Sequence, residues 1–151
     1  MTDHARTVRG FTGVYHADGG IRGELAYIAG KLLGRAHCGL CDITHGPLHR
    51  KRQWDAFVAC LGVSFHLVHL NERDSAISDI SQGATPCVIA HTDAGPILVM
   101  NPEQVDAANG DVEAFADLLR HALTQHALDL PARSARTRIV SDGGSDPRQN
   151  L

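Results

Sequence analysis

Residues 85–100, T-P-C-V-I-A-H-T-D-A-G-P-I-L-V-M, decide the fold that the sequence predicts. Two short apolar runs, Cys87 to His91 and Ile97 to Met100, stand on either side of a turn that contains glycine and proline. Such a pair of runs around a turn is typical of an antiparallel β-hairpin. The dipeptide Thr85-Pro86 leads directly into the first run. We therefore expect a hairpin over residues 87–100.

The chain before the hairpin alternates between strand and helix patterns. Residues 11–16 predict a short strand that ends at a glycine-containing turn. An amphipathic helix is expected next, because apolar residues recur at helical spacing at Leu25, Ile28, Ala29, Leu32 and Leu33. A second helix is expected from Pro47, with a core-facing stripe of Trp54, Phe57, Val58 and Leu61. Residues 63–70 predict a buried strand, whereas residues 71–82 are polar and predict at most a weak helical turn.

The last predicted helix begins after the N-cap residue Asp111 and has a buried side that includes Phe115 and Leu119. The predicted element order is then β, α, α, β, a β-hairpin and α. Strands separated by helices require parallel crossovers, and the hairpin adds an antiparallel edge. The sequence thus predicts an α/β fold with a mixed four-stranded sheet and helices on both faces. Residues 1–130 form a single domain in this interpretation, and residues 131–151 form a disordered tail without periodicity.

Composition and charge exclude several classes of function. The chain has 151 residues, of which 43% are hydrophobic and 21% charged, as is ordinary for a globular protein. Its formal net charge of -3 gives no general attraction to nucleic acid or to an acidic membrane surface. No apolar run approaches the ~20 residues that a membrane span requires, and residues 1–6 lead into no apolar signal segment. We expect a cytoplasmic protein with reduced thiols, whose partner, if it has one, is a protein.

Two of the four cysteines lie in the segment 37–46, H-C-G-L-C-D-I-T-H-G. Cys38 and Cys41 have C-x-x-C spacing, and His45 follows in what the sequence predicts to be a loop after the first helix. Two thiolates and one imidazole are three of the four ligands of a tetrahedral zinc site. The fourth ligand would be one of His37, His49, Cys87, His66 or His69. An open fourth position would instead leave room for water and for catalysis.

The same two thiols also have a redox interpretation. Cys38 and Cys41 could cycle between a dithiol and a disulfide, with Cys87 as a resolving thiol if Pro86 packs against their loop. A loop, however, lacks the activation that a helix N-terminus gives to a thiol. In a third interpretation Cys38 and Cys41 are simply small loop residues, and Cys60 and Cys87 lie in the core. The protein would then be a non-catalytic module that binds another protein.

The element order, the C-x-x-C pair and the Thr85-Pro86 dipeptide resemble the thioredoxin-like superfamily. That resemblance implies a cis peptide bond before Pro86, beside the dithiol. It also implies a dithiol directly after the first strand, where a family of bacterial thioredoxin-like proteins carries D-G-x-C-x-x-C. This chain keeps Asp18-Gly19 but has Ile21 and Glu24 in place of those cysteines. The segment C-G-L-C-D-I-T-H-G is also similar to that of small bacterial proteins, a similarity that implies no activity.

Overall fold

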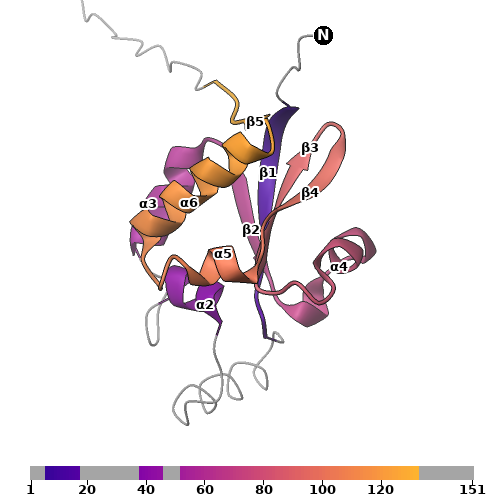
Figure 1. Ribbon diagram of the computed structural model, residues 1–151, viewed down its shortest axis with the longest axis vertical. Helices are drawn as coiled ribbons and strands as arrows, with labels where there is room; N and C mark the ends of the chain where they lie inside the picture. Colours follow the sequence, from indigo (N-terminus) through magenta and orange to yellow (C-terminus); the bar gives the residue numbers. More distant parts are fainter. Residues whose placement is uncertain (1–5, 18–37, 46–51, 133–151) are drawn as a thin grey trace, which may run out of the picture.

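The computed structural model describes residues 6–17, 38–45 and 52–132 (Figure 1). Its centre is a mixed sheet with the strand order β2-β1-β3-β4. These strands are β1 (Arg6–Val14), β2 (Ser64–Val68), β3 (Cys87–Thr92) and β4 (Gly95–Met100). β1 runs parallel to β2 and antiparallel to β3, and β3 and β4 form the antiparallel hairpin. The predicted thioredoxin-like α/β fold is therefore confirmed, including the hairpin over residues 87–100.

The sheet has one strand more than the sequence predicts. β5 (Leu128–Asp129) pairs in parallel with the first residues of β1. β1 itself begins at Arg6, five residues before the predicted start, because Arg6 and Thr7 pair with this added strand. A strand of two residues has no alternation of apolar and polar side chains, so no sequence pattern could have indicated β5.

Helices cover both faces of the sheet, as the sequence predicts (Figure 1). One face carries α2 (Gly39–Thr44), α3 (described over Arg52–Leu61), α5 (Pro102–Asp106) and α6 (Val112–Gln125). The other face carries α4 (Ser75–Ser81), which follows the short 3-10 helix η1 (Leu70–Glu72). The prediction of at most a weak turn over residues 71–82 was wrong. Asp74 caps α4 by accepting a hydrogen bond from the backbone N–H of Ile77, and this one buried isoleucine was too little to show a helical period.

Side chains that alternate along the strands form two separate hydrophobic cores, one on each face of the sheet. The main core lies under α2, α3, α5 and α6, and it includes Val88 and Ala90 of β3. The second core lies on the α4 side and consists of Val14, Ile77, Cys87 and Ile89. Neighbouring residues of β3 therefore face opposite ways, as the pleat of a strand requires.

An aromatic cluster fills the middle of the main core. The ring of Trp54 in α3 lies 4.9 Å from that of Phe65 in β2 and 5.6 Å from that of Phe115 in α6. Both Trp54 and Phe115 are fully buried. Asp111 begins α6 as expected, because its carboxylate accepts the backbone N–H of Ala114. The aromatic cluster thus joins two helices to the sheet.

Several sequence predictions fall outside the described residues. These are the helix over residues 24–33, the junction at Ile21 and Glu24, and the tail from residue 133 onward.

The Thr85–Pro86 peptide bond is cis, as the resemblance implies. Among the helices that the structure describes, none has the length and apolar character to cross a membrane.

Candidate dithiol site

The C-x-x-C segment forms a helix, so the loop predicted for it was wrong. Cys38 is the N-cap of α2, and Cys41 lies inside the helix one turn later. Leu40 and Ile43 are fully buried in the main core. Their spacing of three residues was the only apolar pattern in the segment, and a single pair does not distinguish a helical turn from a loop. The helical conformation of this segment therefore depends on its packing against the main core.

The sulfur of Cys38 receives hydrogen bonds from its own helix and from the segment that follows β1. The backbone N–H of Cys41 donates to Cys38 Sγ at 3.4 Å. The pKa of Cys38 falls to about 7, first because of the Cys41 side chain, and further because the backbones of His16 and Cys41 donate to the sulfur. Burial and the carboxylate of Asp42 oppose this lowering. Near neutral pH, Cys38 and Cys41 together therefore carry a substantial fraction of one thiolate charge.

This low pKa predicts a pH dependence of the stability of the reduced protein. The folded state lowers the pKa of Cys38 from 9.0 to about 7, so it holds the thiolate better than the unfolded chain does. The resulting contribution is complete above pH 9 and is lost as the pH falls through 7. We expect urea unfolding to show a larger rise in stability across this window for wild type than for Cys38→Ser. Parallel curves for the two proteins would contradict the assigned pKa.

α2 lies close to β1 because β1 has a glycine beneath it. A Cβ atom at Gly13 would come within 3.0 Å of Leu40 Cδ2 in α2, and within 3.0 Å of Phe65 Cε1 and 2.9 Å of Leu67 Cδ2 in β2. Carbon atoms at such distances overlap. The absence of a side chain at position 13 therefore allows the helix that carries both cysteines to lie directly on the sheet.

A second glycine, between Cys38 and Leu40, allows α5 to approach α2. A Cβ atom at Gly39 would overlap Asp106 Oδ1 and would lie 3.3 Å from Asp106 Cα. The backbone conformation of Gly39 does not itself demand glycine, since its φ is not in the left-handed region. The residue is small because a neighbouring helix occupies the space, and sequence reasoning missed the Asp106 side chain of α5 that lies against Gly39.

Gly39→Ala is expected to destabilise the protein by about 1–3 kcal/mol, as overpacking usually does. The clash is specific to Asp106, so Asp106→Ala should relieve part of it. A double-mutant cycle measured by urea unfolding then gives a coupling of about 0.5–3 kcal/mol between the two positions. Additive effects of the two substitutions would show that Asp106 does not limit the space at position 39.

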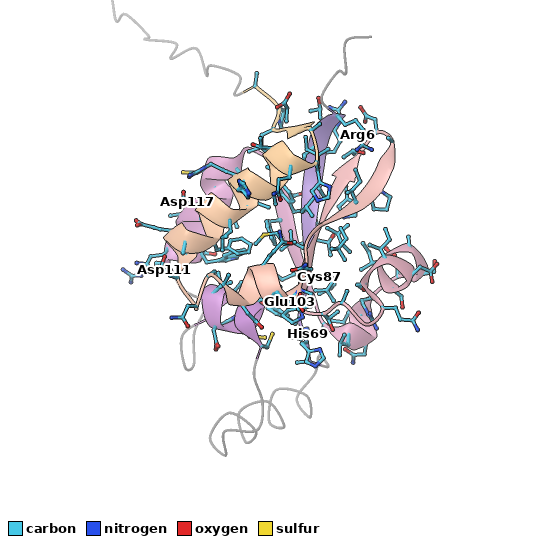
Figure 2. All side chains as sticks on the ribbon, in the orientation of Figure 1. Arg6, His69, Cys87, Glu103, Asp111 and Asp117 are labelled. Carbon is cyan, nitrogen blue, oxygen red and sulfur yellow. The ribbon has the colours of Figure 1, made fainter. Side chains whose placement is uncertain are left out.

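The far end of α2 is fixed to the residue directly after β1 by a buried hydrogen bond. The Tyr15 hydroxyl lies 2.8 Å from Thr44 Oγ1, and both side chains are buried. His45 Nδ1 lies 2.7 Å from the same Thr44 oxygen and 3.4 Å from the Tyr15 hydroxyl. The Tyr15 ring also packs against the ring of His69, 4.9 Å away. Figure 2 shows His69 at the end of the sheet where α2 lies. Sequence reasoning missed Tyr15 and Thr44.

The predicted metal ligands do not gather into one site in the described part of the chain. The imidazole Nδ1 of His45 contacts Thr44 and Tyr15, and the Nδ1 of His69 contacts Glu72 at 2.9 Å. Over residues 6–17, 38–45 and 52–132, no group of three His, Cys, Asp or Glu side chains is arranged to hold a metal ion. His66 is exposed on β2, and His37 and His49 lie outside the described residues.

The other two cysteines lie away from the dithiol. Cys87 belongs to the second core, on the opposite face of the sheet from Cys38, and burial raises the pKa of its thiol to about 11. It is therefore not brought together with the pair for which it was the predicted resolving thiol. Cys60 is exposed on α3, so its predicted place in the core was wrong. Its helix buries Trp54 and Leu61 instead.

The turn before β3 does approach the dithiol, through His16. The ring Nδ1 of His16 lies 2.8 Å from Thr85 Oγ1, and the backbone of the same residue donates to Cys38. Pro86 follows Thr85 and is buried.

Compared with family models, with curated proteins and with solved structures, the chain matches none of them. The chemistry of the site therefore has to be inferred from its own residues.

Proposed function

We propose that the protein is a thiol–disulfide oxidoreductase of a reducing compartment such as the cytoplasm, and that Cys38 and Cys41 are its redox pair. The observation that carries this proposal is the contact between them: Cys41 donates to the Cys38 sulfur and lowers its pKa to about 7. A thiol with a pKa near 7 is partly ionised at neutral pH and is a competent nucleophile and leaving group. The backbone of His16 donates to Cys38, and the His16 ring contacts Thr85 beside the cis proline Pro86.

The proposed reaction transfers two electrons from the dithiol to a disulfide substrate. One sulfur of the pair attacks the substrate disulfide, forms a mixed disulfide and releases the first substrate thiolate. The second sulfur then attacks the first, forms the Cys38–Cys41 disulfide and releases the second thiolate. The substrate is reduced and the protein is oxidised, and an external thiol reductant, such as glutathione, restores the dithiol.

Oxidation with a thiol reagent tests this function. The reduced protein is treated with oxidised glutathione, digested under acid and mapped by mass spectrometry. A Cys38–Cys41 disulfide is expected, and catalytic amounts of the protein should accelerate the reduction of insulin by dithiothreitol. A protein whose Cys38 and Cys41 remain thiols, and which does not accelerate the reaction, is not an oxidoreductase of this kind.

The alternative is the zinc site predicted from the sequence. The redox pair is favoured over it because the His45 Nδ1 contacts Thr44 and Tyr15. Elemental analysis of protein purified without chelator distinguishes the two. Stoichiometric zinc that is lost in Cys38→Ser would favour the metal site. Metal binding would then explain why Cys38 and Cys41 do not form a disulfide. If neither metal nor turnover is found, the remaining proposal is a module that binds another protein.

A further inference from the structure

We infer that Cys41 is the sulfur that exchanges with the substrate, and that Cys38 is the buried sulfur that leaves and returns. This assignment rests on the proposed function and gives the two cysteines different roles within it. It depends on their positions in α2: Cys38 caps the helix and has no exposed surface, whereas Cys41 is partly exposed. A substrate must therefore reach Cys41 first.

Cys38 is buried and is held by contacts with the chain after β1 and with its own helix. The backbones of His16 and Cys41 both donate to its sulfur. The next residue, Gly39, has α5 against it, and Leu40 after that is fully buried on β1. To expose Cys38, the first turn of α2 would have to leave the main core, with the loss of the buried surface of Leu40.

The last turn of α2 is fixed as firmly, so Cys41 keeps its orientation. The hydrogen bond between Tyr15 and Thr44 joins that turn to the residue directly after β1. The carbonyl oxygen of Cys41 accepts the backbone N–H of His45 at 2.9 Å. With both ends fixed, Cys41 packs against the main core but stays partly exposed, whereas Cys38 stays buried. The difference in exposure is thus a property of how α2 packs.

The chemistry of exchange agrees with these roles. When a substrate thiolate attacks Cys41 in the Cys38–Cys41 disulfide, the bond between the two cysteines breaks and its electron pair goes to Cys38. A sulfur leaves faster when its thiol has a lower pKa, and Cys38 has a pKa of about 7 with two backbone donors around it. In the opposite direction the Cys38 thiolate attacks Cys41 and releases the substrate thiolate.

Trapping the mixed disulfide tests the assignment. Cys38→Ser and Cys41→Ser are each reduced, incubated with oxidised glutathione, quenched in acid and mapped by mass spectrometry. We expect Cys38→Ser to accumulate a glutathione adduct at Cys41, and Cys41→Ser to form the adduct at Cys38 at least about tenfold more slowly, because reaction follows access to the sulfur. Cys60→Ser is the matched control, and circular dichroism checks that each variant is folded.

A second measurement uses the wild-type protein, so the test does not depend on the variants. Rapid acid quench of reduced wild type with oxidised glutathione should give a transient adduct at Cys41. An adduct at Cys38, or equal rates in the two variants, would overturn the assignment while leaving the redox function intact. A wild-type protein that never forms the Cys38–Cys41 disulfide would instead contradict the proposed function itself, and the assignment would fall with it.

Discussion

Cys38→Ser and Cys41→Ser are each expected to abolish turnover of a disulfide substrate under steady-state conditions. Two sulfurs are needed to take up two electrons and release both substrate thiolates, so a single remaining cysteine stops at the mixed disulfide. The measurement is insulin reduction by dithiothreitol, with the uncatalysed rate subtracted. Cys60→Ser changes an exposed cysteine on α3 and should keep the wild-type rate.

The loss must come from chemistry rather than from unfolding. Serine is nearly isosteric with cysteine, and in Cys38→Ser its hydroxyl can still accept at the N-cap of α2. The unfolding midpoints of the two variants should therefore stay close to that of wild type at pH 7. Full turnover in either variant would exclude the Cys38–Cys41 pair as the redox centre, and a large loss of stability would point to a structural role for these sulfurs.

Phe115→Ala is expected to cause the largest loss of stability, about 3–5 kcal/mol, because it leaves a cavity in a fully buried cluster. The ring of Phe115 lies 5.6 Å from that of Trp54 and 5.7 Å from that of Phe57, so its removal takes away the ring contacts of two aromatic residues of α3. Urea unfolding gives the free energy, with Trp54, the only tryptophan, as the fluorescent probe.

Leu118→Ala is the matched control for this substitution. Leu118 lies on the same helix but is only partly buried against the main core, so its truncation should cost clearly less. Equal losses for the two variants would mean that helix propensity rather than the aromatic cluster determines the stability of α6. Phe115→Leu, which keeps most of the volume, should fall between Phe115→Ala and wild type.

The parts of the fold that the sequence predicted are those with a local physical cause. The hairpin over residues 87–100 has two apolar runs around one turn, and both strands appear where those runs lie. Asp111 caps α6 because a carboxylate at that position satisfies a backbone N–H of the first turn. These features depend on neighbours within a few residues, so a single sequence contains enough information to place them.

The candidate site was harder to predict because its contacts join distant parts of the chain. Tyr15 and Thr44 are 29 residues apart, and Asp106 reaches Gly39 from another helix. The spacing of Cys38 and Cys41 indicated the pair but not that it begins a helix, since α2 is held by Leu40, Ile43 and the end of β1 rather than by helix propensity. Only the fold could show that Cys87 faces the other side of the sheet.

Gly13 gives the helix that carries the two cysteines a rigid support. Because position 13 has only a hydrogen atom, α2 lies against the backbone of a central strand that has hydrogen-bonded neighbours on both sides. A support of that kind moves little when two sulfurs 3 residues apart in one helix become bonded to each other. If Cys38 and Cys41 form the proposed redox pair, we therefore expect the hydrogen bonds around the sulfurs, rather than a rearrangement of the fold, to set its reduction potential.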